Sequence, residues 1–485
     1  MPDAPQPSRD WRLFVPALAT ATLVIKLALA AAFPGFQSGD DLEIVESAAR
    51  AALGFPYVPW DIRSQFHPLL FAAPFLRLGD AFGFHGPRAL TWFAAVPTAL
   101  FSSAGIVLLD RLTRTLGGSA AVGRAAAFLF AVHWLPFGYA TMPFPRPIST
   151  TLLLAAYLLV ARVDAGGPAA FASGVAAAAA MTVRWSDGVL AAPLVLFAAR
   201  RTRRPARALA VLAGFAVGLL LFAGLFDAVT RGDWFASLRA FLRYAGDPAE
   251  WGSAEHRRPW FWYLTNLLGW AGPVLVLLAA AGAPDRRARA PLLVAASAVA
   301  LLSLSPMKQP RYVQAAIPFL ALAAGFGWER LRQRWPRSAI AALVAAVPLG
   351  LDRTLHLLRH KSMAAAAAAA ALSFMPHPPR VVVLEQAWAY GGALAFAPGT
   401  AIRDVTPRRA LRADALGPIV RGADAVALYA EDLAEPAGHR LGDAFRPCAT
   451  VRVPESPDVV VFLPRSRDCA ALVLPPGISE SGPGS

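Results

Sequence analysis

Residues 13–33 read LFVPALATATLVIKLALAAAF, an apolar run interrupted by a single charge, Lys26. A transmembrane helix needs about 20 consecutive apolar residues, so this run is long enough to span a bilayer. Its small residues before Phe33 resemble a signal-peptide cleavage site, but the run is longer than a signal core and further apolar runs follow it. We therefore interpret it as a retained first span. Lys26 lies near enough to the external end to reach the headgroups, which favours a structural role, although a charge inside a span is often functional.

The composition of the whole chain agrees with this interpretation. Of its 485 residues, 56% are apolar and only 16% are charged, whereas soluble domains carry about 25% charged residues. Apolar runs recur between short polar gaps, which predicts a polytopic α-helical membrane protein with about 11 transmembrane helices. We place the spans at residues 13–33, 89–109, 125–141, 148–163, 168–183, 188–200, 206–228, 261–281, 291–306, 312–328 and 338–356.

The gaps between the spans alternate in character. Arginines gather in RRTRRPAR (200–207), DRRARA (285–290) and ERLRQRWPR (329–337), and the positive-inside rule places such gaps in the cytoplasm. The other gaps hold aromatic, proline and isolated charged residues, which is typical of functional surfaces. We therefore expect the chemistry on the extracytoplasmic side, at the inner or plasma membrane of a bacterium or the endoplasmic reticulum of a eukaryote. The net charge of +15 is explained by this topology rather than by nucleic-acid binding.

The composition changes near residue 357, which predicts a membrane domain (1–356) and an extracytoplasmic C-terminal domain (357–485). An alanine-rich helix is followed by short strand-like runs between turn residues, which favours a small α/β domain. These runs are RVVVLE (380–385), ADAVALYA (423–430), CATVRV (448–453) and DVVVFLP (458–464). Cys448 and Cys469 form one disulfide if this part faces an oxidising compartment; otherwise they are two unrelated thiols.

Two adjacent carboxylates, Asp40 and Asp41, follow the first span. They open a predicted helix that runs to Leu53, with Gly54 at the usual stop position. The helix has an apolar stripe and a polar side that includes Glu46, so we expect it to lie along the membrane surface. By position alone, Asp40 is an N-cap and Asp41 a first-turn acid that the helix dipole favours.

A second external stretch, residues 60–67, holds Trp60, Asp61, Arg63 and His67. Each of these residues alone is usually structural. Together with the paired acid they form an ordered pattern that resembles the family 22 glycosyltransferases, membrane mannosyltransferases of the GT-C superfamily that use dolichyl-phosphate mannose. The matching pieces are Asp40-Asp41, Glu46, Gly54, Trp60-Asp61, Arg63-Ser64 and Pro68. The family usually has Asp-Glu and Trp-Glu at the two acidic pairs.

The block SPMKQPRYVQAAIPFLALAAG (305–325) resembles the family's His-Lys-Glu-x-Arg-Phe motif. Lys308, Arg311 and Tyr312 match it, whereas a methionine and a glutamine replace the His and the Glu. Arg146 and Arg184 stand where the family also carries arginines. The resemblance covers much of residues 33–330 and implies a GT-C-like fold with interfacial helices in the first external loop.

The resemblance implies transfer of a sugar, with mannose favoured, from a polyprenyl-phosphate donor to a hydroxyl of a glycan, glycolipid or protein. A carboxylate takes the acceptor proton, and cations stabilise the leaving phosphate. We assign Asp40 as the base and Asp41 as the residue that orients it or binds the acceptor. Single displacement with one base inverts the anomeric centre. The residues assigned to substrate binding are Glu46, Trp60, Asp61, Arg63, His67, Arg146, Arg184, Lys308, Arg311 and Tyr312.

Several alternatives stay open at this point. Lys308 and Arg311 could anchor a helix end at the headgroups instead of binding phosphate. A lipid monophosphate needs no metal to leave, so we expect no cofactor; the alternative is a divalent ion held by Asp40 and Asp41.

The competing function is a multi-span transporter or lipid flippase without transferase activity. Transporters carry charges and broken helices at mid-membrane, whereas these motifs lie at span ends and no internal repeat is visible. A GT-C relative that modifies protein or lipid A-like acceptors is the other enzymatic alternative.

Overall fold

The computed structural model describes residues 13–33, 35–37, 39–55, 61–162, 166–202, 205–246, 257–359, 364–385, 395–397, 399–405, 416–430, 433, 441, 443–453, 458–473 and 479–480. The chain forms two compact units. The first contains Met1–Ala28, Trp60–His67 and Pro97–Leu355, and the second contains Leu29–Pro59, Pro68–Val96 and His356–Ser485.

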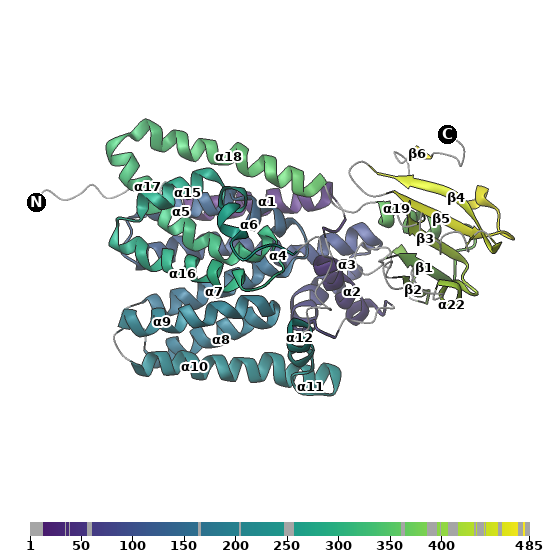
Figure 1. The fold of residues 1–485 in the computed structure, drawn as a ribbon, viewed down its shortest axis with the longest axis horizontal. Helices are drawn as coiled ribbons and strands as arrows, with labels where there is room; N and C mark the ends of the chain where they lie inside the picture. Colours follow the sequence, from purple (N-terminus) through teal and green to yellow (C-terminus); the bar gives the residue numbers. More distant parts are fainter. Residues whose placement is uncertain are drawn as a thin grey trace, which may run out of the picture. The chain divides into compact units, whose positions relative to one another are not determined.

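The first unit is built from helices (Figure 1). They are α1 (Phe14–Ala32) and α4 (Pro87–Thr115), which the division between units crosses, then α5 (Ala120–Val132), α6 (Trp134–Gly138), η3 (Tyr139–Thr141), α7 (Pro145–Ala161), α8 (Gly167–Val183), η4 (Trp185–Leu190), α9 (Ala191–Thr202), α10 (Pro205–Leu219), η5 (Leu220–Leu225), α11 (Phe226–Arg231), α12 (Ala236–Gly246), α13 (Trp262–Thr265), α14 (Leu267–Trp270), α15 (Pro273–Gly282), α16 (Arg286–Ser303), η7 (Pro310–Ala316), α17 (Ile317–Arg334) and α18 (Pro336–Arg359).

All the predicted spans overlap helical segments, but few of these segments are long unbroken spans. Four described helices are long and apolar enough to cross a membrane: Phe14–Ala32, Arg88–Thr115, Pro205–Arg231 and Pro336–Arg359. A fifth results if Ala120–Val132 and Trp134–Thr141, which meet at a bend of 59°, form one broken span. Helices α7, α8 and α15 are apolar but shorter. The predicted number of about 11 spans therefore stays a prediction.

Small residues allow helices of the first unit to pack backbone against backbone. A Cβ atom on Gly214 of α10 would lie 1.9 Å from the carbonyl oxygen of Phe171 on α8. One on Gly327 of α17 would lie 1.8 Å from that of Leu278 on α15. Membrane helices are held together largely by such close packing, because lipid tails are as apolar as the helices themselves.

Lys26 does not reach the headgroups, so the prediction of a snorkelling side chain is wrong. Its side chain is buried, and Nζ donates to the hydroxyls of Ser102 at 2.9 Å and Ser103 at 3.3 Å on α4. It also lies 5.6 Å from the centre of the Phe137 ring. These partners within the helix bundle replace water, and Lys26 joins α1 to α4.

The second unit contains α2 (Gly39–Leu53), the π-helical segment η2 (Pro68–Ala72), α3 (Ala73–Ala81), α19 (Ala364–Ser373), α22 (Leu416–Val420) and the short η11 (Cys469–Ala471). It also holds a six-stranded sheet of order β2-β1-β3-β5-β4-β6. The strands are β1 (Val381–Glu385), β2 (Ala401–Val405), β3 (Ala425–Tyr429), β4 (Phe445–Arg452), β5 (Val459–Pro464) and β6 (Ser479–Glu480). Strand β1 runs parallel to β2 and β3, and the remaining pairs are antiparallel.

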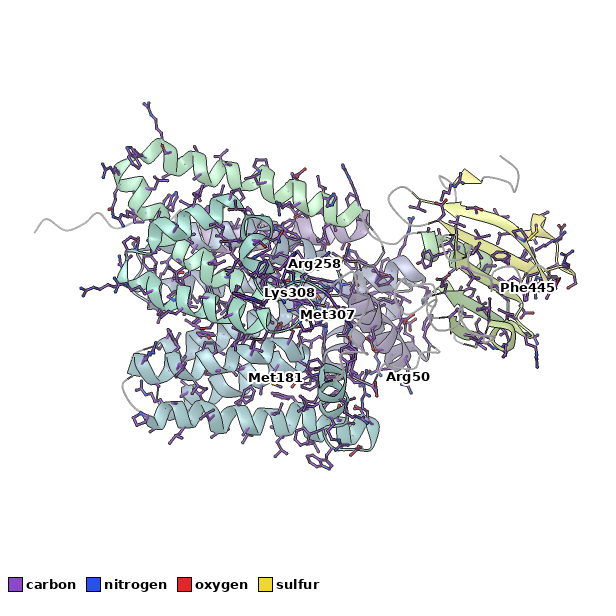
Figure 2. The ribbon with its side chains drawn as sticks, viewed as in Figure 1. Arg50, Met181, Arg258, Met307, Lys308 and Phe445 are labelled. Atoms are coloured by element: carbon purple, nitrogen blue, oxygen red, sulfur yellow. A yellow bond between two sulfur atoms is a disulfide. The ribbon has the colours of Figure 1, made fainter. Side chains whose placement is uncertain are left out.

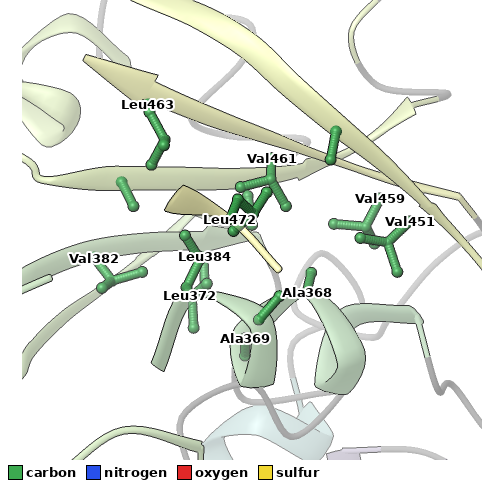
Figure 3. Close-up of a cluster of buried hydrophobic side chains, with 14 of the residues drawn as sticks. Ala368, Ala369, Leu372, Val382, Leu384, Val451, Val459, Val461, Leu463 and Leu472 are labelled. Carbon is green, nitrogen blue, oxygen red and sulfur yellow. The ribbon is translucent and has the colours of Figure 1, made fainter. Parts of the chain in front are cut away.

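The sheet buries both of its faces. Alternate residues of β1 and β5 pack on the alanine-rich helix α19, as Ala368 and Leu372 do against Leu384 and Val461 (Figure 3). The opposite face packs on α22, where Leu416 and Val420 belong to a second cluster with Val383 and Val426. Four of the strands lie in the runs predicted as strands, and β2 and β6 do not.

The two cysteines are bridged. Cys448 of β4 and Cys469 of η11 form a disulfide across a sequence separation of 21 residues. The structure therefore agrees with the disulfide alternative rather than with two separate thiols.

Candidate functional site

Helix α2 of the second unit carries the paired acid and begins and ends where the sequence predicts. It spans Gly39–Leu53 with Asp40 and Asp41 in its first turn, and Gly54 follows with a φ of +75°. The Asp41 carboxylate accepts the backbone N–H of Gln37 at 2.8 Å. Asp41 thus ties the chain that enters the helix to its first turn. Its predicted role of orienting Asp40 or binding the acceptor stays a prediction.

The polar side of α2 is buried, in contrast to the predicted surface helix. Asp40 is 8% exposed, Glu43 is 3% exposed and Glu46 is 1% exposed. A helix lying on the membrane surface would present this side to water. Instead α2 packs against η2 and α3, and of its charged residues only Arg50, at the C-terminal end, is exposed (Figure 2). The structure therefore buries several carboxylates on one helix.

Residues 61–67, which carry the second external stretch, belong to the first unit. Trp60 lies outside the described residues. The Asp61 side chain is exposed, Arg63 is half-buried and His67 is 1% exposed. The backbone carbonyls of Asp61 and Arg63 accept hydrogen bonds from Arg231.

His67 is neutral in the folded protein, because burial lowers its pKa to about 3 from the ordinary 6.5. The unfolded chain binds a proton below pH 6.5 that the folded chain excludes down to about pH 3. The free energy of unfolding therefore falls as the pH falls through this window. We expect the melting temperature of the solubilised protein to drop between these pH values, and the His67→Gln variant to lose part of that drop.

The exposed His85 provides a matched control for this measurement. A His85→Gln variant should follow the wild-type pH profile. A His67→Gln profile identical to that of the wild type would show that His67 is not the group responsible.

Arg146 lies at the start of α7 and is wholly enclosed. Its guanidinium donates to the Asp187 carboxylate at 2.9 Å and to the backbone carbonyl of Tyr312 at 3.1 Å. It also donates to Ser186 at 3.2 Å and lies over the Tyr312 ring at 4.8 Å. Asp187 in turn accepts from Ser149. Arg146 thus joins α7, η4 and η7, which favours a supporting role over direct contact with substrate.

Arg184 stands between α8 and η4 and is half-buried. Its backbone N–H donates to Ala180 at 3.0 Å, and its carbonyl accepts from Asp187 at 2.9 Å. Its backbone therefore joins the end of α8 to the segment that carries the partner of Arg146.

The second motif forms the segment that leads into η7. Lys308 donates to the carbonyls of Ser305 and, at 3.3 Å, of Arg258; Lys308 and Arg258 are labelled in Figure 2. Burial lowers the pKa of the Lys308 ammonium below its ordinary value. The Arg311 guanidinium lies 5.5 Å from the Phe144 ring centre and 5.7 Å from that of Tyr312. The structure thus brings the second motif together with Arg146.

An apolar cavity of about 620 Å³ adjoins this segment. It is lined by Trp260, Leu264, Leu267, Trp270, Leu292, Ala295, Ala296, Val299, Ala300, Ser303, Leu304 and Leu320. Ser303 and Leu304 directly precede Ser305, whose carbonyl accepts from Lys308. Trp260 follows shortly after Arg258, whose carbonyl is the other acceptor. Lys308 therefore binds the chain next to two of the segments that line the cavity.

Sequence reasoning missed several of these residues. Glu43 could have been found, because it stands three positions after Asp40 and therefore on the same side of the helix. Asp187 and Trp185 gave no local signal, since their partners Arg146 and Ile62 are 41 and 123 positions away.

The described residues contain no group of three or more His, Cys, Asp or Glu side chains arranged to hold a metal ion. The expectation of no cofactor stays a prediction.

Comparison with known proteins gives one family and one fold. The model of the Alg9-like mannosyltransferase family matches residues 21–381. Among curated protein sequences, none matches the chain.

Three solved structures illustrate the fold. ArnT from Cupriavidus metallidurans, bound to undecaprenyl phosphate, is 14% identical with a TM-score of 0.66, and the match covers 95% of this chain and 99% of ArnT. The oligosaccharyltransferase of Archaeoglobus fulgidus is 11% identical with a TM-score of 0.53, covering 98% and 76%. The arabinofuranosyltransferase AftD from Mycobacteria is 16% identical with a TM-score of 0.58, covering 96% and 40%. At these identities the likeness concerns the fold.

Proposed function

Because the chain belongs to the Alg9-like mannosyltransferase family, we propose that it transfers mannose from a polyprenyl-phosphate donor to an acceptor hydroxyl on the extracytoplasmic side of the membrane. It is a membrane glycosyltransferase with the fold of GT-C enzymes. The alternative of a transporter or flippase without transferase activity is therefore set aside. The sugar, the acceptor and the side of the membrane are parts of the proposal.

One observation supports the lipid-phosphate donor most strongly: a cationic cluster adjoins an apolar cavity in the first unit. Lys308 binds the carbonyls of Ser305 and Arg258, which neighbour in sequence two of the segments that line the cavity. Arg311 follows Lys308 by three residues. An apolar cavity can hold part of a prenyl chain, and guanidinium and ammonium groups bind phosphate oxygens. The solved ArnT structure contains undecaprenyl phosphate, a molecule of this chemical class.

The surroundings of Arg311, Lys308 and Arg146 favour a different role for each. Arg311 is half-buried against Phe144 and Tyr312, and we assign it the phosphate contact. Lys308 supplies a second positive charge and also holds the segment in place through two carbonyls. Arg146, which is paired with Asp187, holds Tyr312 in place by donating a hydrogen bond to its backbone carbonyl.

We propose that the transfer is a single displacement. The acceptor oxygen attacks the anomeric carbon, the bond from that carbon to the phosphate oxygen breaks, and the acceptor proton passes to Asp40. The products are the inverted glycoside and polyprenyl phosphate. Asp41, fixed to Gln37, orients the start of the helix. Charge on the leaving phosphate is neutralised by protein cations, so no metal is part of the proposal.

Arg311→Ala is expected to lower kcat/KM for the lipid donor about tenfold to hundredfold, because it removes a charge-assisted contact worth about 1.5–3 kcal/mol. Lys308→Ala should have a similar effect. The measurement is steady-state kinetics in lipid, with the melting temperature recorded alongside. Arg330→Ala, which changes an exposed arginine of α17, serves as the matched control. Wild-type kinetics in both site variants would reduce these residues to headgroup anchors.

The sugar is tested by incubating the purified protein in lipid with labelled polyprenyl-phosphate sugars and a panel of acceptors. We expect the mannose donor to be used best. Preference for another hexose or a pentose would refute mannose while leaving the donor class intact.

A further inference from the structure

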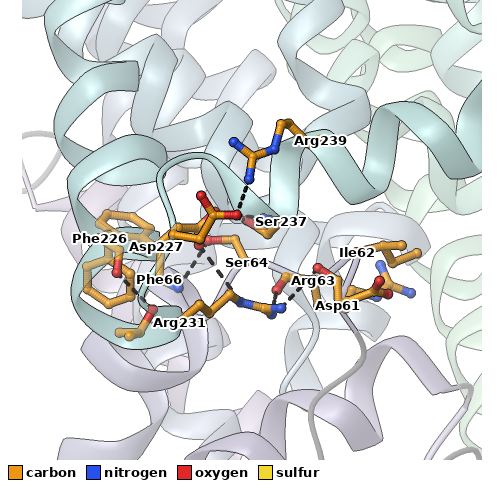
Figure 4. A network of polar contacts seen from close by, with 12 residues as sticks. Asp61, Ile62, Arg63, Ser64, Phe66, Phe226, Asp227, Arg231, Ser237 and Arg239 are labelled. Carbon is orange, nitrogen blue, oxygen red and sulfur yellow. Dashed lines mark hydrogen bonds and ion pairs between the residues drawn. The ribbon is translucent and has the colours of Figure 1, made fainter.

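Three consecutive backbone carbonyls in the turn Asp61–Arg63 are each held by a side chain from elsewhere in the first unit. Arg231 of α11 donates to the Asp61 carbonyl at 3.1 Å and, with its other terminal nitrogen, to that of Arg63 (Figure 4). The indole N–H of Trp185 donates to the intervening Ile62 carbonyl at 3.0 Å. These three hydrogen bonds are made to backbone carbonyls, so they fix the path of the backbone at Asp61–Arg63.

Helix α11, which carries Arg231, is itself held in place by buried contacts. Asp227, one helical turn earlier on α11, is wholly buried and accepts from the Ser237 N–H at 2.8 Å and its hydroxyl at 2.6 Å. The Arg231 guanidinium lies 4.0 Å from the same carboxylate. Phe66, just after the turn, packs on Phe226 at 5.6 Å between ring centres.

The backbone immediately before α11 is unusual. Residues Leu220–Leu225 form a π-helical segment, and such segments are rare and frequently found at functional sites. Here the residues that follow are those that hold the turn. The irregular helix and the clamp therefore belong to one arrangement.

The segment η4 connects the turn to Arg146 and Arg311. Trp185 and Asp187 both belong to the short segment η4. Trp185 holds the turn, whereas Asp187 binds Arg146, which contacts Tyr312 next to Arg311. The turn is thus linked through η4 to the segment to which we assign the phosphate.

We propose that Arg231 and Trp185 form a two-armed clamp that positions the turn Asp61–Arg63 for glycosyl transfer, and that Arg231 is its principal positioning residue. The inference rests on the proposed function, since it assigns substrate contact to the side chains of the turn. The clamp touches no substrate itself. It fixes the backbone of the turn at a constant position relative to η4.

Two variants remove the hydrogen bonds with little change in shape. Arg231→Lys keeps the charge near Asp227 but cannot reach two carbonyls, because an ammonium lacks the guanidinium fork. Trp185→Phe keeps an aromatic ring and removes the N–H. We expect kcat/KM to fall about tenfold to hundredfold in Arg231→Lys, since small displacements of positioning groups have effects of this size. Trp185→Phe should lose less, and the double variant should depart from additivity because both act on one turn.

A purely structural role would give a different result. For a positioning role, added methylguanidinium should restore part of the activity of Arg231→Ala, with the melting temperature unchanged by the additive. Arg239→Ala, which removes a neighbouring exposed arginine paired with Asp233, should keep wild-type kinetics. Wild-type kinetics in Arg231→Lys, or losses that track a lowered melting temperature without rescue, would overturn the inference.

The outcome separates the clamp from the proposed function. If the wild type transfers sugar and Arg311→Ala is impaired while Arg231→Lys is not, only the clamp fails. If the wild type uses no polyprenyl-phosphate sugar, the proposed function fails first.

Discussion

An Asp40→Asn enzyme is expected to fold normally and to transfer sugar about 10²–10⁴ times more slowly than the wild type, the usual cost of removing a general base. Asn has the same shape as Asp, and Asp40 lies inside the first turn of α2 rather than at its N-cap, so the helix should survive the change. The amide cannot accept the acceptor proton, and only the chemical step should suffer. Single-turnover kinetics with bound donor would measure the step directly.

Asp41→Asn is the matched control. Asp41 accepts the Gln37 N–H through one oxygen, which an amide oxygen can also do, so this variant should keep far more activity than Asp40→Asn. If Asp41→Asn were the inactive variant, the two roles would be exchanged. Near wild-type rates in both variants would show that Asp40 and Asp41 only stabilise the start of α2.

Asp187→Ala is expected to destabilise the first unit by about 3–5 kcal/mol, because it leaves the Arg146 charge buried without its partner. Both side chains are 1% exposed, so water cannot replace the lost carboxylate. The loss should appear as a lower midpoint of thermal or denaturant unfolding in detergent. Activity should fall with it, since Arg146 also supports Tyr312.

The exposed ion pair of Asp285 and Arg287 provides the comparison. Asp285→Ala should cost about 0.5–2 kcal/mol, because it removes the N-cap of α16 as well as a surface ion pair. The double variant Arg146→Met with Asp187→Leu should recover part of the stability lost in Asp187→Ala, because no unpaired charge remains. Equal losses for Asp187→Ala and Asp285→Ala would contradict the role given to the buried pair.

Features that depend on neighbouring residues were predictable from the sequence. Helix α2 starts at the paired acid and stops before Gly54 because caps and glycine act locally. The strands β1, β3, β4 and β5 follow from compact apolar runs, whereas β2, with Arg403 and Asp404 among its five residues, carries no such run. The family pattern was likewise readable, because its motifs are short and ordered.

Features that depend on distant contacts were not predictable. Nothing near Arg146 in the sequence indicates that Asp187 will neutralise it, and Arg231 is about 170 positions from the turn that it holds. The burial of Glu43 and Glu46 also escaped prediction. A polar stripe on a helix looks the same in the sequence whether it faces water or an enclosed site, so the pattern alone could not distinguish the two.

The most direct test of the central claim follows the donor itself. Purified protein in lipid vesicles would be given polyprenyl-phosphate mannose labelled in both the sugar and the phosphate, together with an acceptor that it uses. We predict one free polyprenyl phosphate for each mannose transferred, and a product of inverted anomeric configuration. Movement of the intact donor across the bilayer without cleavage, or transfer from a nucleotide sugar instead, would contradict it.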